Sequence, residues 1–368
     1  MINKNRLINF FEKIVKIDSP SKEEKEIMAF LRAYLEDLGF KCHEDHAAEK
    51  SGGNANNLYG VLKGDPNHKS ICFNAHTDTV KSTKDIKIIN NGKTIKSDGN
   101  TILGADDKAG VAIIIEAIQS IIENKTPHGD IYVLFTVQEE IGVSGAEMIE
   151  TEGFNPDYCF SFDTTVPVIT LVAGAPTHFI MKYKIHGKSA HAAYAENSVN
   201  SIFVAASAIS KLQTGILDED SCCNFGKITG GERFNIVPDY CEVWVECRSR
   251  NNDKANQLEQ KITKTFEEEC EKAGATLEKE VRCGYRAFNI EKDDPQFVLA
   301  RNTALEMGIE PEIEYSLGGY DASIFNEKGL KTMVSSTGYD KMHTTEEVLD
   351  IDQFVLACEY AYKLIENV

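Results

Sequence analysis

The chain has 368 residues, of which 42% are hydrophobic and 26% are charged, and its net charge is −19. This composition is typical of a globular protein, and the length is enough for two domains. The negative charge argues against nucleic acid or a membrane as a partner, because both require a basic surface. No apolar run approaches the ~20 residues that cross a bilayer. The 10 cysteines include no Cys-x-x-Cys pair, so we expect reduced thiols and a cytoplasmic location.

The first part of the chain predicts two helices and a buried strand. Apolar residues at helical spacing predict a helix over 5–17. Ser21 and Glu24 have the form of a capping box, which would open a second helix that ends before Gly39. The short apolar run over 71–75 predicts a strand that is buried on both faces of a parallel sheet.

Strands and helices continue to alternate further along the chain. Asn90-Asn91-Gly92 predicts a hairpin within 85–100, and the long apolar stretch that follows has helical length. This alternation predicts an α/β fold with a mixed, mainly parallel sheet flanked by helices. The helical stretch covers 111–122, and the further strands are expected over 131–137, 158–162 and 331–335.

The pattern changes between 176 and 288. There the order of expected elements is βαββαβ, which is the ferredoxin-like motif. The α/β pattern resumes at Asp294, so we expect one domain of residues 1–175 and 289–368 and an inserted domain of residues 176–288. The inserted strands are expected over 179–185, 223–229, 240–247 and 276–286, with helices over 197–212 and 253–273, and the resumed pattern predicts helices over 295–307 and 352–366.

Side chains that bind divalent metals follow the predicted parallel strands. Parallel sheets place their chemistry beyond the carboxyl ends of their strands. Histidines and carboxylates gathered at one edge form a ligand set for zinc, and they are too many for one tetrahedral ion, so we expect two ions that share a carboxylate. The candidates that follow a strand or precede a helix are His76, Asp78, Asp106, Glu139, Glu140, Asp163 and His343.

Each candidate alone has an ordinary structural explanation. Asp106 or Asp107 could be the N-cap of a helix, and Glu139-Glu140 could be a solvated strand end. Taken together these explanations are weak, because clustered carboxylates without a metal would repel one another and shift toward protonation. The set therefore favours a metal centre.

These residues and their spacing resemble the M20 family of metallopeptidases, and within it the peptidase T-like branch, over essentially the whole chain. The resemblance implies a catalytic domain with two zinc ions per subunit, for which cobalt or manganese are alternatives. It also implies that the inserted domain is a lid through which the chain forms a homodimer. The motifs that carry the resemblance are His76-Thr77-Asp78, Gly104–Gly110, Glu139-Glu140, Asp163, Gly187–Ala192 and Met342-His343-Thr344.

The resemblance also implies a role for each candidate of the metal centre. Asp106 would bridge the two ions, and its peptide bond to Asp107 is expected to be cis. Asp78 would accept a hydrogen bond from His76 and raise its basicity. Glu139 would be the general base, taking a proton from the bridging water and returning it to the leaving amine. The remaining ligands would be His76 and Asp163 on one ion and Glu140 and His343 on the other.

Further site residues are implied in the inserted domain and in a glycine-rich loop. His191 would reach the active site of a partner subunit and stabilise the oxyanion, although a surface turn histidine is the simpler alternative. Asn235 and Arg248 resemble substrate contacts, and Arg248 could equally form an exposed salt bridge. Gly318-Gly319 resembles the substrate loop, for which a tight turn is the alternative. Leu317 stands where tripeptide-specific members have an arginine, so hydrolysis is better supported than tripeptide selectivity.

The sequence thus predicts a cytoplasmic metallo-exopeptidase that removes residues from di- or tripeptides. The alternative within the same chemistry is an M20-type amidohydrolase that deacylates N-acyl amino acids. A phosphoesterase is less favoured, because the inserted domain has no evident basic cradle for phosphate. A non-catalytic protein would be favoured if Glu139 or a metal ligand were missing, and each of these residues is present.

Overall fold

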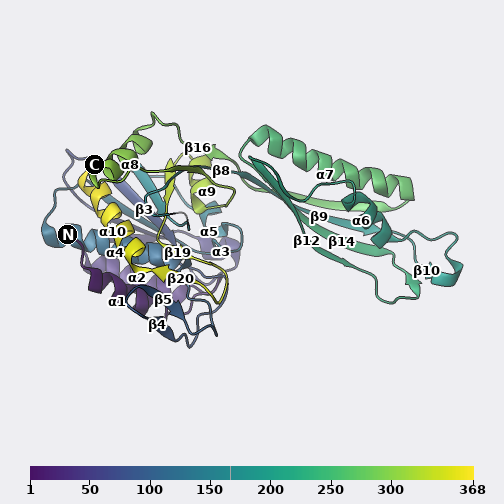
Figure 1. Cartoon of the computed structure of the whole chain (residues 1–368), viewed down its shortest axis with the longest axis horizontal. Helices are drawn as coiled ribbons and strands as arrows, with labels where there is room; N and C mark the ends of the chain where they lie inside the picture. Colours follow the sequence, from purple (N-terminus) through teal and green to yellow (C-terminus); the bar gives the residue numbers. More distant parts are fainter. Residues whose placement is uncertain (166) are drawn as a thin grey trace. The chain divides into compact units, whose positions relative to one another are not determined.

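The computed structural model describes residues 1–165 and 167–368, and the contacts of the chain divide it into two compact units. The first unit contains Met1–Ala173, Asn289–Glu314 and Tyr320–Val368, so it includes both ends of the chain (Figure 1). The second unit contains Gly174–Phe288 and the short segment Tyr315–Gly319. Each unit is described below by itself.

The first unit is built on a nine-stranded sheet with the order β1-β2-β6-β3-β7-β18-β8-β16, in which β17 also pairs with β8. The central neighbours β6, β3, β7 and β18 are parallel, whereas β1–β2, β2–β6 and β18–β8 are antiparallel. The predicted mixed sheet with a parallel centre is therefore confirmed. The strands are β1 (Lys41–Glu44), β2 (Leu58–Leu62), β3 (Ile71–His76), β6 (Ile131–Thr136), β7 (Tyr158–Phe162), β8 (Leu171–Ala175), β16 (Phe288–Asn289), β17 (Ile313–Tyr315) and β18 (Thr332–Ser335).

Helices cover this sheet and explain why its central strands are apolar on both faces. Every residue of β3 is buried, and α4 packs against β3, α1 and α10, so that nearly all of α4 is buried as well. Among the described residues, no helix has the length and hydropathy to cross a bilayer. The helices of this unit are α1 (Lys4–Ile14), α2 (Lys25–Asp37), α3 (Ala47–Ser51), α4 (Ala105–Asn124), α5 (Ser144–Glu147), α8 (Pro295–Glu306), α9 (Asp321–Glu327) and α10 (Ile351–Glu366).

A four-stranded sheet of the order β19-β20-β5-β4 joins two short strands that precede α10 to a hairpin that precedes α4. Its hairpin of β4 (Ile88–Asn90) and β5 (Thr94–Ser97) confirms the one predicted at Asn90-Asn91-Gly92. On the other side, β20 (Val348–Asp350) pairs with both β5 and β19 (Tyr339–Asp340). The segment between β19 and β20, which carries His343, is therefore anchored at both ends.

The second unit contains a five-stranded antiparallel sheet of the order β11-β12-β14-β9-β15 (Figure 1). Helices α6 and α7 pack against it, so the predicted βαββαβ domain is confirmed, with β11 as an additional short strand. The strands are β9 (Thr177–His186), β11 (Gly215–Asp218), β12 (Ser221–Gly230), β14 (Tyr240–Ser249) and β15 (Thr276–Tyr285), the helices are α6 (Ser201–Ile209) and α7 (Asn252–Ala273), and a two-stranded sheet joins β10 (Ala190–His191) to β13 (Ile236–Val237).

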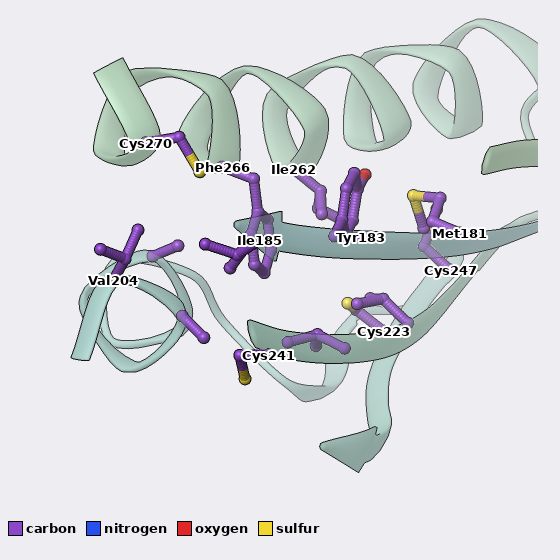
Figure 2. Packing of buried hydrophobic residues seen from close by; sticks show 14 of the residues in the cluster. Met181, Tyr183, Ile185, Val204, Cys223, Cys241, Cys247, Ile262, Phe266 and Cys270 are labelled. Atoms are coloured by element: carbon purple, nitrogen blue, oxygen red, sulfur yellow. The ribbon is translucent and has the colours of Figure 1, made fainter. Parts of the chain in front are cut away.

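The core of the second unit lies between its five-stranded sheet and the helices α6 and α7 (Figure 2). Alternate residues of β9, including Met181, Tyr183 and Ile185, are buried on the face toward α7. The rings of Tyr183 and Phe266 stack with centroids 4.3 Å apart, and the Tyr183 hydroxyl lies 2.7 Å from Thr263 Oγ1. Burial of a large apolar side chain such as Phe266 contributes ~1.5–3 kcal/mol to the stability of the fold. The second unit therefore has a hydrophobic core of its own.

The capping box predicted at Ser21 and Glu24 is wrong. Helix α2 begins at Lys25 without a side-chain cap, and the Ser21 hydroxyl instead donates to Asp78 Oδ2 at 2.7 Å. Glu24 Oε1 accepts the backbone N–H of Gln138 at 3.0 Å. The reason is that Gln138 is fully buried just after β6, where a backbone N–H must find an acceptor within the protein.

Candidate metal centre

The carboxyl ends of three parallel strands place the predicted ligands at one edge of the sheet. His76 is the last residue of β3, Glu139 and Glu140 follow β6, and Asp163 follows β7 directly. Asp106 comes from the first turn of α4, and its side chain, like those of His76 and Asp163, is almost entirely buried. The predicted ligands therefore lie at strand ends and at the start of a helix, as expected for parallel sheets.

Asp106 lies between two groups of ligand atoms. On one side, His76 Nε2 is 3.0 Å from Asp106 Oδ1 and 3.8 Å from Asp163 Oδ1, and we call these three residues the His76 group. On the other side, His343 Nε2 is 3.2 Å from Asp106 Oδ2 and 3.0 Å from Glu140 Oε2, and we call these three residues the His343 group. Each group offers one imidazole nitrogen and two carboxylate oxygens, a donor set that suits a divalent metal.

Asp107 is a fully buried carboxylate next to Asp106 in the chain. The peptide bond between Asp106 and Asp107 is cis, as the sequence resemblance implied. Asp107 Oδ1 accepts the backbone N–H of Gly110 at 3.2 Å, whereas Oδ2 has no hydrogen-bond partner among the described residues. Ligand atoms of His76, Asp107 and Asp163 lie within 4.8 Å of one another. Asp107 therefore belongs to the same acidic cluster.

The carboxylates of this cluster raise one another's pKa. Burial raises the pKa of Glu139, Asp107 and Asp163 well above the ordinary values, and neighbouring carboxylates raise it further. Burial alone would also raise the pKa of Asp106, but hydrogen bonds with His343 and His76 outweigh it and lower that pKa. Glu140 Oε1 is buried and, like Asp107 Oδ2, has no partner among the described residues. Such uncompensated negative charge is what bound divalent cations would neutralise.

Asp78 holds the turn that carries the two glutamates. Its Oδ1 accepts the backbone N–H of Glu139 at 2.9 Å, and its Oδ2 accepts that of Glu140 at 3.2 Å. His76 Nδ1 lies 3.1 Å from the backbone oxygen of Asp78 and 3.4 Å from its Oδ1. Asp78 thus contacts His76 with its backbone more closely than with its carboxylate, and most of that carboxylate is used to fix the 139–140 backbone.

Glu347 and Tyr339 hold Asp106 from opposite ends, and sequence reasoning missed both. Glu347 Oε1 accepts the backbone N–H of Asp106 at 2.9 Å, while its Oε2 accepts those of Leu103 and Gly104 at 2.9 and 2.8 Å. The Tyr339 hydroxyl lies 3.2 Å from Asp106 Oδ1. Their position on either side of His343 was the only sequence signal that could have drawn attention to them.

Asp321 is another buried carboxyl that sequence reasoning missed, although it follows the glycine-rich loop. It begins α9, and its Oδ2 accepts a hydrogen bond from the Thr136 hydroxyl at the end of β6. Burial is the main reason why its pKa rises to about 6. Its charge in turn helps to raise the pKa of Glu139 and Asp163, which adds one more acid to the cluster.

Two of the predicted residues in the second unit lie side by side. His191 in β10 is the pairing partner of Ile236 in β13, and the N–H of Ala192 donates to the backbone oxygen of Asn235 at 3.0 Å. His191 is exposed, and its Nδ1 accepts the N–H of Ala193 at 3.2 Å. The remaining ring nitrogen, Nε2, therefore carries the proton when the imidazole is neutral.

Arg248 lies in the five-stranded sheet, near the end of β14 that is farther along the chain from Asn235. In the pairing of β14 with β9, Tyr240 faces His186 at one end and Arg248 faces His178 near the other, a separation of roughly 26 Å along the strand. Arg248 Nη1 donates to the backbone oxygen of Leu317 at 3.1 Å, which ties it to the Gly318-Gly319 loop.

Arg248 and Gly319 each have close neighbours within the unit. Arg248 Nη2 donates to Glu246 Oε2 at 3.0 Å, so a salt bridge is formed, although both side chains are partly buried and not exposed as the alternative had it. A Cβ atom at Gly319 would lie 1.9 Å from the Tyr285 hydroxyl, so any larger residue at this position would require the buried Tyr285 side chain to move.

Comparisons with known proteins match the chain over most or all of its length. Residues 72–367 match the family model of peptidase family M20/M25/M40. A tripeptidase from Staphylococcus aureus is 35% identical, with a TM-score of 0.96 over 100% of this chain and 98% of that one. The aminopeptidase PepT from Bacillus cereus is also 35% identical, with a TM-score of 0.92 over 100% and 99% of the two chains.

A curated relative points in the same direction. Peptidase T from Clostridium perfringens is 28% identical over 89% of this chain and 81% of its own length. These matches confirm the resemblance to the peptidase T-like branch and the predicted class of metallo-exopeptidases. The chain therefore belongs to peptidase family M20/M25/M40.

Proposed function

We propose that this chain is a two-metal aminopeptidase that hydrolyses short peptides. One observation carries the proposal: Asp106 turns one carboxylate oxygen to His76 and the other to His343. A carboxylate shared in this way suits the bridging ligand of a two-metal site, and hydrolases use paired metals to cleave amide bonds. Membership of a peptidase family makes the peptide bond the expected target.

The proposed ligands divide into the two groups described above. His76 and Asp163 would hold one ion, Glu140 and His343 the other, and Asp106 would contribute to both. Imidazole and carboxylate ligands favour zinc, and cobalt or manganese would also fit them. Bound in this way, the ions would polarise the peptide carbonyl and make water acidic near neutral pH.

Glu139 is the proposed general base. Asp78 fixes its backbone, and burial with the nearby charge of Asp163 raises its pKa well above the ordinary value, which favours proton uptake. Glu139 takes a proton from the attacking water as the water oxygen bonds to the peptide carbon. It then gives that proton to the amine nitrogen as the C–N bond breaks.

The proposed substrates are peptides of two or three residues with a free N-terminus. The similar Staphylococcus aureus and Bacillus cereus proteins are described as a tripeptidase and an aminopeptidase, which supports this size and direction. Asn235, Arg248 and the Gly318-Gly319 loop are the proposed substrate contacts. Because Leu317 offers only an apolar side chain beside that loop, we expect dipeptides as well as tripeptides to be hydrolysed.

A homodimer formed through the second unit is also part of the proposal. Strand β11 pairs only with the first residues of β12, so within the described chain the outer edge of β12 from Asn224 to Gly230 has no strand beside it. Unpaired edges readily pair with another chain. Phe203 in α6 and Ile228 in β12 are 72% and 53% exposed, which would suit an interface between two copies.

His191 is proposed to act in the active site of the partner subunit. Its ring is exposed, and the hydrogen bond from Ala193 to Nδ1 leaves Nε2–H free to donate. A donor of this kind would stabilise the negative charge that develops on the peptide oxygen during attack. The cytoplasmic location remains a prediction from the sequence.

The experiment that tests this function is a substrate panel with zinc-loaded, full-length protein. We expect Leu-Gly and Leu-Gly-Gly to lose the N-terminal leucine, and N-acetyl-leucine to be unreactive. Preferential cleavage of the N-acetyl amino acid would replace the aminopeptidase by the deacylase alternative. No cleavage of any compound in the presence of zinc, cobalt or manganese would contradict the proposal.

A variant of the proposed base completes this test. Glu139→Gln should lower kcat by ~10²–10⁴-fold, the contribution of general acid–base catalysis, and leave the metal content unchanged. Glu147→Gln is a matched control, because Glu147 lies after the same strand in α5. Activity that survives in Glu139→Gln would remove Glu139 from its role.

A further inference from the structure

Tyr339 brings a hydroxyl to only one of the two ligand groups. Its hydroxyl lies 3.2 Å from Asp106 Oδ1 and 3.1 Å from Asp163 Oδ1, the two carboxylate oxygens of the His76 group. Within the described part of the chain, the structure records no hydrogen bond from this hydroxyl to Glu140 or His343. The two groups therefore differ in what surrounds them.

The position of the Tyr339 hydroxyl is fixed by its surroundings. The residue is 2% exposed, so its ring is enclosed by protein. Its backbone is also held, because Tyr339 pairs with Leu349 and Asp340 pairs with Val348 between β19 and β20. A side chain with so little freedom can orient the groups that it contacts at little further cost in entropy.

The chemistry of the contact is that of one donor and two acceptors. A neutral phenol has a single O–H, whereas Asp106 and Asp163 offer only acceptor oxygens when they are ionised. The O–H can donate to either oxygen, so it holds the two oxygens close together although their charges repel. That is the arrangement that a cation bound by both oxygens requires.

We propose that Tyr339 is a positioning residue for the metal ion of the His76 group and makes the two metal positions unequal. This inference rests on the two-metal site proposed above. By orienting Asp106 Oδ1 and Asp163 Oδ1 in advance, Tyr339 strengthens binding at the His76 group. It leaves the His343 group, which uses Asp106 Oδ2, largely unaffected.

The test is a metal titration of the full-length protein and of Tyr339→Phe, which removes only the hydroxyl. Both are stripped with a chelator and titrated with Zn²⁺ in competition with a chromophoric chelator, which gives a Kd for each ion. We expect the Kd of one ion to rise ~10–100-fold, the usual effect of removing a hydrogen-bond partner of a metal ligand. The other Kd and the Tm of the stripped protein should stay close to those of the unmodified chain.

Tyr360→Phe is the matched control. Tyr360 is also a buried tyrosine of the first unit, and its hydroxyl donates to the backbone oxygen of Ala300 at 3.0 Å. It makes no contact with the ligand groups, so its loss should leave both Kd values unchanged. If Tyr339→Phe does not fold, Tyr339→Met gives a second side chain without a hydroxyl, because methionine fills irregular space.

The outcomes separate this inference from the function on which it rests. Equal Kd changes at both positions, or no change at either, in a folded Tyr339 variant would overturn the role of Tyr339 while the two-metal site stands. Failure of the unmodified chain to bind zinc would instead contradict the proposed function itself. A selective rise in one Kd, absent from Tyr360→Phe, supports the inference.

Discussion

The two units offer a contrast between the buried acids Glu139 and Asp163 of the first and the partly buried acid Glu246 of the second. In the first unit, burial and neighbouring carboxylates raise the pKa of Glu139 and Asp163 well above the ordinary values. In the second unit, a hydrogen bond from His178 and the charge of Arg248 lower the pKa of Glu246 to about 2. Burial keeps His178 largely neutral, because it lowers the pKa of that ring, so the charge on Glu246 is balanced mainly by Arg248.

The difference shows which acids require a ligand. Glu246 has its positive partner within the protein, so this carboxylate is stable as an ion without any bound molecule. The cluster around Asp106 contains His76 and His343 but more carboxylates than cations, and three of its buried oxygens have no hydrogen-bond partner among the described residues. Bound cations would neutralise the negative charge that this cluster cannot balance by itself.

Removing the negative charge of Asp106 should have the largest effect on zinc binding and peptide hydrolysis. Asp106→Asn keeps the shape of the side chain but weakens one ligand of both proposed ions. We expect zinc binding and peptide hydrolysis to fall by ~100-fold or more, since even partners outside the ligand set contribute 10–100-fold. Metal analysis after dialysis and a Leu-Gly-Gly assay measure the two effects. Retention of both ions with full activity would show that Asp106 is not a bridging ligand.

A substitution of Glu347, which holds the backbone of Asp106, should have a smaller effect on the binding of both proposed ions. Glu347→Gln replaces one of the oxygens that accept the N–H groups of Leu103, Gly104 and Asp106 with an amide NH₂, which cannot accept them. Because Asp106 serves both groups, we expect both zinc Kd values to rise, by ~10-fold. This outcome contrasts with the selective effect expected for Tyr339→Phe. A change in only one Kd would contradict it.

The exposed histidine of the second unit should affect turnover but not metal binding. His191→Ala is expected to lower kcat for Leu-Gly-Gly by ~10²–10³-fold, the effect of losing one donor to the developing oxyanion. Zinc content and Tm should not change. His186→Ala is the control, because His186 is another partly exposed histidine of this unit, 3.7 Å from Glu278. Equal losses in both variants would point to damage of the unit instead.

Glu24 in the first unit and Glu246 in the second should contribute to the pH dependence of stability with opposite signs. Burial raises the pKa of Glu24 from 4.5 to about 7, so its contribution to stability is present below pH 4.5 and is lost as the pH rises to 7. The lowered pKa of Glu246 gives a contribution that is present above pH 4.5 and lost as the pH falls toward 2.

Urea unfolding between pH 3 and pH 8 measures both signs. Relative to the unmodified chain, Glu24→Gln should gain ~2–3 kcal/mol as the pH rises from 4.5 to 7. Glu246→Gln should differ from the unmodified chain most above pH 4.5 and least at the acidic end. Parallel stability curves for both variants would contradict the comparison.

The sequence predicted what depends on local pattern. Runs of apolar residues located β3, β6 and β7. His76 and Asp163 could be identified because the first ends β3 and the second directly follows β7. It could not predict contacts between distant segments. Glu347 and Asp106 are separated by 241 positions, and no local pattern links them. The capping box predicted at Ser21 and Glu24 was wrong for the same reason. Ser21 donates to Asp78 and Glu24 accepts the backbone N–H of Gln138, and both partners are in distant segments.

The same limit applies to the second unit. Its βαββαβ order followed from the alternation of strands and helices, and the structure confirms it. The sequence left open whether Arg248 contacts a substrate or forms a salt bridge, and it named no partner for such a bridge. The folded sheet supplies one in Glu246, which stands two residues away on the same face of β14.

The number of metal ions that each chain binds decides whether the centre around Asp106 holds a pair of ions. Full-length protein is dialysed to equilibrium against buffered Zn²⁺, and zinc and protein are then quantified. We expect ~2 zinc ions per chain, one at the His76 group and one at the His343 group, with Asp106 shared between them. One ion or none at saturating zinc would contradict it.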